Sequence, residues 1–237
     1  MKKISVLVTV SIMAISMITS CNHISTNVSL KTGADSAKYA IGVNYGAGLR
    51  TGLAQDQYLG DDNPEALIAG FLTALKGDSN ALKLQPEEAQ RFLQTYFMNA
   101  QAKEAESTKA EGDAFLAGNK GKDGIITTES GLQYKVITEG SGVKPTAEDT
   151  VKVHYTGKLL DGTEFDSSVT RGEPFTTAAN RVIAGWTEVL QLMPVGSKYE
   201  VWIPSELGYG PQGAGQMIKP NSVLNFEIEL LDVIKKK

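Results

Sequence analysis

The sequence lacks most of what covalent or metal-dependent catalysis needs. It has one cysteine and two histidines among 237 residues, so neither a disulfide within the chain nor a thiolate–imidazole metal cluster is expected. No nucleophile–base pair stands out. A net charge of -4 argues against nucleic acid as a partner, because phosphate binding needs a basic surface. The three glycines between Gly210 and Gly215 precede no helix signal, so we expect no phosphate loop and no cofactor.

Long hydrophobic runs are also scarce, and the clearest lies at the N-terminus. Ile4–Ile18 is apolar over 15 residues and follows two lysines. It is shorter than the ~20 residues that a membrane-spanning helix needs and is typical of a signal peptide. Residues 18–21 (Ile-Thr-Ser-Cys) resemble the lipobox of bacterial lipoproteins. This resemblance implies that residues 1–20 are removed and that Cys21 carries lipid chains, several of which anchor a protein stably.

An ordinary secretory signal with an incidental free thiol is the open alternative. Acylation of Cys21 accounts for the lone cysteine of an exported protein, so the lipoprotein interpretation is favoured. Asn22, and not the aspartate associated with inner-membrane retention, follows Cys21. We therefore expect an anchor in the outer membrane, with the protein facing the periplasm.

Residues 21–33 are polar and predict a flexible tether, and residues 34–119 predict helices. Glycines at 42, 46 and 48 indicate close packing of the first helix against another, because glycine weakens an isolated helix. The second helix has Asn63 as its expected cap, Pro64 at its first position and Gly77 after its end. Its expected buried stripe comprises Ala66, Leu67, Gly70, Phe71, Ala74 and Leu75. The third helix is long, from about Pro86 to Gly118.

The third helix predicts a buried face only in its first half, at Phe92, Leu93, Tyr96, Phe97 and Ala100. Its second half is alanine-rich and charged, and we expect it to be a solvated connector. Three helices make a thin core, and small domains are marginally stable alone. We expect residues 34–119 to be a dimerisation domain, with a self-sufficient monomeric bundle as the alternative.

After residue 119 the pattern changes to short strands, expected at Gln133–Thr138, Val151–Leu160, Tyr199–Pro204 and Val223–Val233. Leu224, Phe226 and Ile228 alternate with polar residues, which indicates an antiparallel sheet with one apolar face. Asp161-Gly162 predicts a hairpin. Val182–Gln191 is the one amphipathic helix expected here. The fold class is α+β: an all-helical N-terminal domain, a long connecting helix, and an antiparallel half-barrel wrapped on one short helix.

The motifs VHYTGKLLDGTEFDSS, RGEPF, VIAGW, GYG and LNFEIELLDV make residues 120–237 resemble an FKBP-type peptidyl-prolyl cis-trans isomerase domain. The whole mature chain is similar to the macrophage infectivity potentiator kind, which are exported V-shaped homodimers. The resemblance implies a proline pocket lined by aromatic and apolar side chains around one acid. Its implied catalytic residues are Tyr155, Phe165, Asp166, Trp186, Tyr209 and Phe226, and its implied substrate-binding residues are Arg171, Phe175, Val182, Ile183, Met217 and Ile218.

The resemblance also implies individual roles: Trp186 as the pocket floor, Tyr209 as a hydroxyl donor to a substrate carbonyl, and Asp166 pairing with Arg171 or Tyr155. Each residue taken singly has a plainer interpretation. Phe165, Phe226 and Trp186 are also typical core residues, and Asp166 could cap or hydrogen-bond the turn formed by Ser167 and Ser168. His154 is expected to be structural, because it points away from the face that Tyr155 occupies.

Peptide-bond rotation suits such a pocket, because it needs no proton transfer. The resemblance implies an isomerase that accelerates X–Pro rotation in unfolded exported proteins. A membrane-tethered dimeric chaperone with little or no isomerase activity is the alternative, and small-molecule transport has less support. The sequence departs from many eukaryotic relatives at Arg181, Ala214 and Met217, which bears on substrate preference more than on activity.

Overall fold

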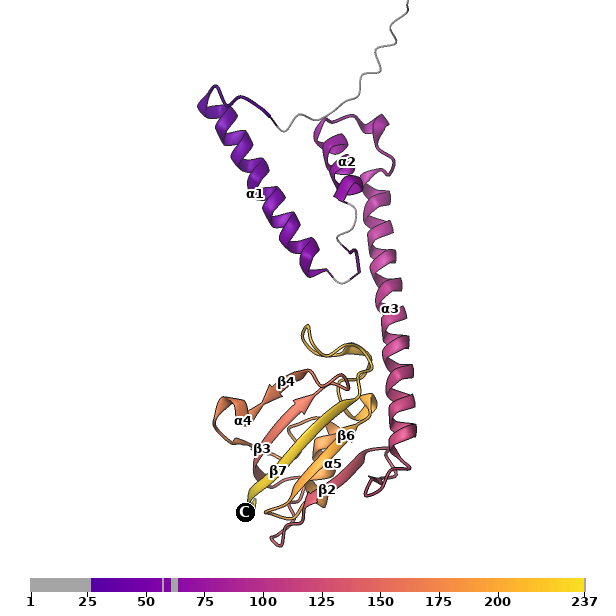
Figure 1. Cartoon of the computed structure of the whole chain (residues 1–237), viewed down its shortest axis with the longest axis vertical. Coiled ribbons are helices and arrows are strands. Elements are labelled where there is room, and N and C mark those ends of the chain that lie inside the picture. The colour runs from indigo at the N-terminus through magenta and orange to yellow at the C-terminus, as the bar shows by residue number, and fades with distance from the viewer. Residues whose placement is uncertain (1–26, 57, 61–63, 237) are drawn as a thin grey trace, which may run out of the picture. The chain divides into compact units, whose positions relative to one another are not determined.

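The computed structural model describes residues 27–236 except 57 and 61–63, so the signal peptide, Cys21 and Asn63 lie outside the described residues (Figure 1). The chain divides into two compact units between Leu67 and Ile68. The helical elements are α1 (Gly33–Gln55), α2 (Pro64–Leu75), η1 (Ser79–Ala81), α3 (Pro86–Asn119), α4 (Ser168–Arg171), α5 (Ala184–Leu192), η2 (Ser205–Leu207) and η3 (Gly210–Gln212). The strands are β1 (Ile126–Thr127), β2 (Gln133–Thr138), β3 (Thr150–Lys158), β4 (Glu164–Ser167), β5 (Phe175–Ala178), β6 (Lys198–Ile203) and β7 (Leu224–Ile234).

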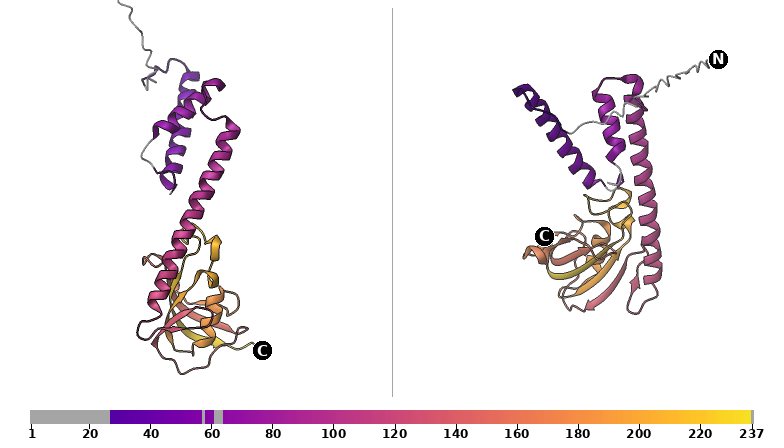
Figure 2. Two further views of the ribbon diagram at one scale, coloured as in Figure 1. Left: turned by 90° about the vertical axis from the view of Figure 1, so that its right-hand side faces the viewer. Right: turned by 45° about the horizontal axis from the view of Figure 1, so that its top comes forward.

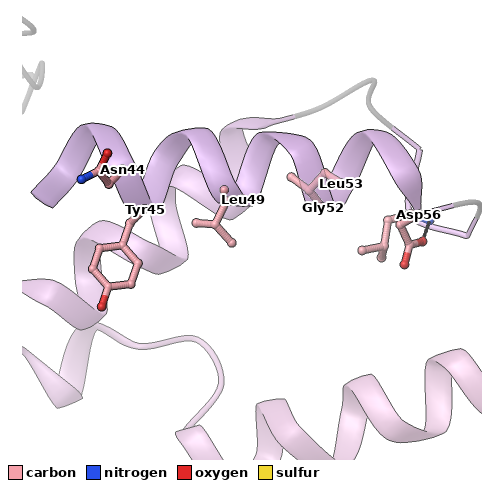
Figure 3. Close-up of a pocket in the computed structure, with 8 residues that line it drawn as sticks. Asn44, Tyr45, Leu49, Gly52, Leu53 and Asp56 are labelled. Atoms are coloured by element: carbon pink, nitrogen blue, oxygen red, sulfur yellow. Dashed lines mark hydrogen bonds between the residues drawn. The ribbon is translucent and has the colours of Figure 1, made fainter.

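Helix α1 begins at a capping box and has an uncovered apolar side. The Thr32 hydroxyl accepts from the Asp35 amide at 3.1 Å, and the Asp35 carboxylate accepts from the Thr32 amide at 3.0 Å. Tyr45 and Leu49 extend from the same side of the helix, over a shallow apolar groove (Figure 3). No described residue of α1 is buried, and nothing lies within 4 Å of where a side chain on Gly42, Gly46 or Gly48 would start. The expected close packing of these glycines is therefore absent within the described chain.

The apolar stripes of α2 and of the first half of α3 are largely exposed. Leu75 is 73% exposed and Phe92 is 57% exposed, and no described residue of α2 is buried. The expectation that these stripes are buried therefore fails for α2 and for Phe92, Leu93 and Tyr96 of α3, whereas Phe97 and Ala100 are half-buried. The helices themselves form as predicted, with Pro64 and Pro86 at their first positions and Gly77 in a left-handed conformation beyond the end of α2.

The second half of α3 packs against the strand domain of the same unit, as the views in Figures 1 and 2 show. Gly112 and Asn119 are buried, and Ala105, Thr108 and Leu116 are half-buried on the same side of the helix. The side chain of Asn119 donates to that of Gln133 on β2 at 2.9 Å. The expectation that this half is a solvated connector is wrong, because its packed face is made mostly of small and polar residues, with Leu116 as a large apolar residue among them.

The strands form one antiparallel sheet in the order β1-β2-β6-β7-β3-β4, with β5 also paired to β3. The four expected strands are present: β2 has the expected bounds, and the ends of β3, β6 and β7 are shifted by one or two residues. At the expected hairpin, Gly162 has φ +88° and donates to the Leu159 carbonyl at 3.0 Å. The left-handed conformation explains why glycine follows Asp161 in this turn.

Inward side chains of β3, β6 and β7 form the core against α5. Val151, Val153 and Tyr155 alternate inward along β3, and α5 buries Trp186, Val189 and Leu190. A side chain on Gly185 would start 2.5 Å from Ile203, so glycine brings α5 close to the sheet. Among the described residues, no helix combines the length and apolar character needed to span a bilayer.

Candidate active site

Three buried rings from three different elements form the centre of the candidate site. The Tyr155 centroid on β3 lies 5.0 Å from that of Trp186 on α5, and the Phe226 centroid on β7 lies 5.3 Å from Trp186. Both pairs are nearly perpendicular, at 87° and 85°, which is a favoured arrangement of aromatic rings. All three rings are buried: Trp186 and Phe226 are 4% exposed and Tyr155 is 7% exposed.

Phe165 and Phe175 extend the ring cluster. Phe165 meets Phe226 edge to face at 5.5 Å, and Phe175 meets Tyr155 at 5.9 Å. Gly157 makes room for the first pair, since a side chain there would start 2.6 Å from Phe226 and 2.7 Å from Phe165. Gly157 was not among the expected site residues. It occupies the inward position after Tyr155 on β3, so the period-two pattern contains the signal.

One polar group, made by Tyr155, Asp166 and Arg171, borders the rings. The Tyr155 hydroxyl and the Arg171 guanidinium both donate to the Asp166 carboxylate, and Arg171 also donates to the Tyr155 hydroxyl at 3.0 Å. The Arg171 guanidinium lies 5.6 Å from the centre of the Tyr155 ring. Asp166 therefore contacts both of the partners named as alternatives for it.

These contacts shift the ionisation of all three groups. Burial, reinforced by the Asp166 carboxylate, raises the pKa of Tyr155. Burial also acts to raise the pKa of Asp166, but the hydrogen bonds from Tyr155 and Arg171 outweigh it and lower that pKa. The hydrogen bonds with Tyr155 and Asp166 raise the pKa of Arg171. This polar group, which forms the rim of the ring cluster, therefore contains an ionised carboxylate and a neutral phenol at neutral pH.

Serine residues, and not Asp166, cap the turn after β4. The Ser167 hydroxyl accepts from the Thr170 amide at 3.2 Å and is the N-cap of α4. The Ser168 hydroxyl accepts from the Tyr155 amide at 2.8 Å and lies 3.1 Å from Nδ1 of His154. Asp166 is therefore not the cap of this turn, but its carboxylate interacts with the Ser167 backbone amide as well as with Tyr155 and Arg171.

Comparison with known proteins places this geometry in a family. Residues 141–231 match the model of the FKBP-type peptidyl-prolyl cis-trans isomerases, and residues 34–136 match that of the domain amino-terminal to it. The chain is 42% identical to the outer membrane protein MIP of Legionella longbeachae over 97% of both chains. The chain belongs to the FKBP-type peptidyl-prolyl cis-trans isomerases.

Other relatives agree with this family assignment. The chain is 47% identical to the FKBP-type 22 kDa peptidyl-prolyl cis-trans isomerase of Escherichia coli, over 81% of this chain and 94% of the relative. The crystal structure of FkpA from Escherichia coli matches with a TM-score of 0.70 and 35% identity, over 87% of this chain and 99% of that one. The family's order of helices, long helix and antiparallel sheet is thus present throughout the chain.

The apolar site residues of this FKBP-type chain lie around the rings. The buried hydrophobic residues that pack together inside the strand domain, which include the three central rings, are called the core cluster. Ile218 is 8% exposed and belongs to the core cluster. Val182 and Ile183 at the start of α5 are half-buried and pack against it. The indole Nε1 of Trp186 is buried and has no partner among the described residues. Such a donor costs about 1–3 kcal/mol. In the described part of the chain, no three His, Cys, Asp or Glu side chains come together as a possible metal site.

Tyr209 and Met217 are exposed, as Arg171 and Phe175 are among the other expected site residues. Tyr209 is 40% exposed and Met217 is 46% exposed. Among the described residues, none is hydrogen-bonded to the Tyr209 hydroxyl and no ring contact joins Tyr209 to the cluster. Both residues belong to the segment between β6 and β7, and its Ala214 and Ile218 exchange backbone hydrogen bonds of 2.8 and 3.1 Å.

The departures from the eukaryotic pattern lie along this segment and before α5. Ala214 is half-buried and packs against the core cluster. Leu207 packs against it as well and, like Gly157, was not among the expected site residues. Arg181 is exposed in the turn that its amide closes by donating to the Ala178 carbonyl at 2.9 Å.

Proposed function

We propose that this protein is a peptidyl-prolyl cis-trans isomerase that accelerates X–Pro rotation in exported proteins as they fold. The observation that carries the proposal is the cluster of Tyr155, Trp186 and Phe226, with a single ionised acid on its border. An apolar cluster of this kind can hold a proline ring without any group that attacks or deprotonates it. The names of the relatives support the same activity.

Rotation about X–Pro is slow because resonance gives the C–N bond partial double-bond character. The barrier is ~18–20 kcal/mol and uncatalysed exchange takes about 10–100 s. The twisted transition state has lost this resonance, so its carbonyl oxygen is less polar than in the planar amide. A dry aromatic pocket therefore binds the twisted form better than the planar one, and such differential binding accelerates the reaction.

The proposed roles follow from burial. Buried Trp186 is the floor beneath the proline ring, and Tyr155, Phe175 and Phe226 are the walls. Phe165 supports Phe226 from behind, and Val182, Ile183 and Ile218 complete the apolar lining. Exposed Tyr209 offers its hydroxyl to a substrate carbonyl, and Met217 contacts the chain that flanks proline. Asp166, held by Arg171, fixes the Tyr155 ring.

The test is an X–Pro exchange assay on a tetrapeptide with the mature protein. We expect the wild type to exceed the uncatalysed rate, and Asp166→Ala to lower kcat/KM about tenfold, which corresponds to ~1.4 kcal/mol of transition-state binding. Trp186→Phe and Trp202→Phe form a matched pair, because Trp202 lies on the opposite face of β6 from the core cluster. The first should lower activity and the second should not. A wild-type rate equal to background contradicts the proposal.

A dimeric chaperone with little isomerase activity is the other candidate, and the exposed apolar helices are the feature in its favour. The family of the C-terminal domain is named for the isomerase reaction, which favours the enzyme. The same wild-type assay separates the two functions.

For localisation, we propose a lipoprotein anchored to the outer membrane through Cys21 and facing the periplasm. The support is the lipobox-like sequence together with a relative named as an outer membrane protein. Cys21→Ser should move the protein from the membrane fraction to the soluble fraction, and unchanged fractionation contradicts the anchor.

A further inference from the structure

The segment between β6 and β7 borders the candidate site and is attached to α3. Residues 213–221 of this segment are called the flap. The flap contains Ile218, which is buried in the core cluster, and Met217, which is exposed beside it. Its turn is closed by the Ala214–Ile218 backbone pair, and its base by the Asn221 amide, which donates to the Gly210 carbonyl at 2.9 Å.

Asn221 makes the first attachment. Its side-chain amide donates to the Ala105 carbonyl of α3 at 3.1 Å, across 116 positions of sequence. Asn221 has φ +60°, and it is the one non-glycine residue with positive φ that the described residues contain. Glycine adopts this conformation more readily, so the conformation alone does not require asparagine. Asparagine adds the amide that reaches the helix.

Lys219 makes the second attachment, one residue after Ile218. Its ammonium lies 2.7 Å from the Glu104 carboxylate, the residue before Ala105 on α3. The Glu104 side chain is 17% exposed and that of Lys219 is 50% exposed, so water screens this pair less than a pair that is fully on the surface. Two neighbouring residues of α3 thus bind two residues of one short loop.

The packing of α3 on the domain makes this attachment firm. A side chain on Gly112 would start 2.7 Å from Val223, two residues beyond Asn221, so glycine lets the helix approach the start of β7. Farther along, the Gln133 side chain on β2 donates to the Leu116 carbonyl at 2.8 Å. The helix is therefore fixed to the sheet at positions that do not belong to the flap.

We propose that α3 is part of the catalytic apparatus: Asn221 and the Glu104–Lys219 pair are positioning residues that hold Ile218 and Met217 of the flap over the proline site. This inference rests on the proposed isomerase activity. The residues touch no substrate themselves. They fix the flap, whose two apolar side chains contact the residues that flank proline and so determine how tightly the peptide binds.

Asn221→Gly tests the first attachment, because glycine keeps the left-handed backbone and removes only the hydrogen bond to Ala105. We expect KM for an X–Pro tetrapeptide to rise about fivefold, as for the loss of one neutral hydrogen bond, with kcat nearly unchanged. Hydrogen exchange at the Ile218 amide should become faster. The melting temperature should stay close to that of the wild type.

Charge exchange tests the second attachment. Lys219→Glu should raise KM, and adding Glu104→Lys should restore it, which a general loss of surface charge cannot do. Lys198→Gln is the matched control, since it breaks the 2.6 Å Lys198–Glu227 pair on β6 and β7, away from the flap. It should leave KM and the exchange of Ile218 unchanged.

The outcomes separate this inference from the proposed function. An inactive wild type contradicts the isomerase itself. An active wild type, with wild-type KM and wild-type Ile218 exchange in both Asn221→Gly and Lys219→Glu, overturns the positioning role alone. A lower melting temperature in these variants without a change in KM also overturns it, because the contacts would then serve only stability.

Discussion

Tyr155 joins the apolar and polar parts of the candidate site within one residue. Its ring faces Trp186 and its hydroxyl donates to Asp166, so the carboxylate at the rim and the rings at the base are held in one arrangement. The same hydroxyl lowers the pKa of Asp166 while burial raises the pKa of Tyr155. A change at Tyr155 should therefore alter the pH dependence as well as the rate.

Tyr155→Phe removes the phenol hydroxyl and keeps the ring. The pKa of Asp166 is below its ordinary value of 3.8 in the wild type, so the carboxylate persists until the pH falls below that value. Loss of one donor raises this pKa. We expect a lower kcat/KM at neutral pH and an acid limb of the pH–rate profile that begins at higher pH.

Tyr199→Phe is the matched control, because Tyr199 is also a buried core tyrosine but stacks on Tyr134 at 5.3 Å. The pH–rate profile of Tyr199→Phe should be the same as that of the wild type. If Tyr155→Phe gives the same acid limb as the wild type, Asp166 does not set that limb.

At the residue scale, the ring residues were expected from the family resemblance, and only Tyr155 and Phe226 lie on strands that the sequence pattern itself predicts. The sequence missed Gly157, whose contribution is the absence of a side chain. It left the partner of Asp166 undecided between Arg171 and Tyr155, since a contact between residues 11 positions apart depends on how β3 and β4 pair. The exposure of Tyr209 agrees with its position between two glycines.

Helices and strands were predictable where they are long enough for the spacing of their apolar residues to repeat. Strands β2, β3, β6 and β7 and helices α1, α2, α3 and α5 all follow such patterns. Strands β1, β4 and β5 have only two to four residues, too few for a period, and tertiary pairing defines them. The packed face of α3 was missed for another reason: Ala105, Thr108 and Gly112 are too small to register as an apolar stripe.

Asp149, just before β3, connects the start of β3 to the residues that follow the neighbouring strand β7. Its 4%-exposed carboxylate accepts from the Lys235 ammonium at 2.8 Å, from the Thr146 amide at 2.7 Å and from the Lys236 amide at 2.9 Å. The Lys235 hydrogen bond first, and then the two backbone donors, hold the pKa of Asp149 well below its ordinary value of 3.8. One carboxylate thus fastens the residues beyond β7 beside the start of β3.

Asp149→Asn should lower the melting temperature at neutral pH by several degrees. A depressed carboxylate pKa contributes stability above the unfolded-state value of 3.8, and that stability is lost as the pH falls through the folded-state pKa. The difference between wild type and variant should therefore shrink as the pH falls below 3.8. Circular dichroism melts between pH 7 and pH 2 measure it.

Glu148→Gln is the control for this prediction, since Glu148 pairs with Lys236 at 3.0 Å but is 66% exposed. An exposed pair contributes little, so its melting temperature should match that of the wild type at every pH. A difference for Asp149→Asn that is constant with pH would assign the effect to packing and not to charge.

At the scale of the whole molecule, the strand domain has a complete core but the N-terminal helices do not. No described residue of α1 or α2 is buried, whereas β3 and β7 bury every second side chain along most of their length. Most helical stability in proteins comes from tertiary packing, so α1, which buries no described residue, needs a partner surface. We propose that a second copy of the chain supplies it, as a homodimer formed through the N-terminal helices.

The groove on α1 and its glycines favour that partner. Tyr45 is 67% exposed and Leu49 is 41% exposed along one side, and Gly48 and Gly52 line the same groove. Glycines on an apolar helix face permit another helix backbone to approach closely, which offsets their weak helix propensity. The same surface in a monomer would leave large apolar side chains in water.

The dimer predicts a sedimentation result that a monomeric bundle does not. Residues 22–237 should sediment as a dimer at micromolar concentration, and Leu49→Lys should shift the protein toward monomer, because a charge cannot be buried in an apolar interface without a large desolvation cost. Ala54→Lys, on the opposite side of α1, should remain dimeric. Tetrapeptide isomerase activity should be the same in both variants, since neither residue belongs to the aromatic site. A monomeric mass for the wild type would exclude the dimer and leave the exposed face of α1 for a different partner.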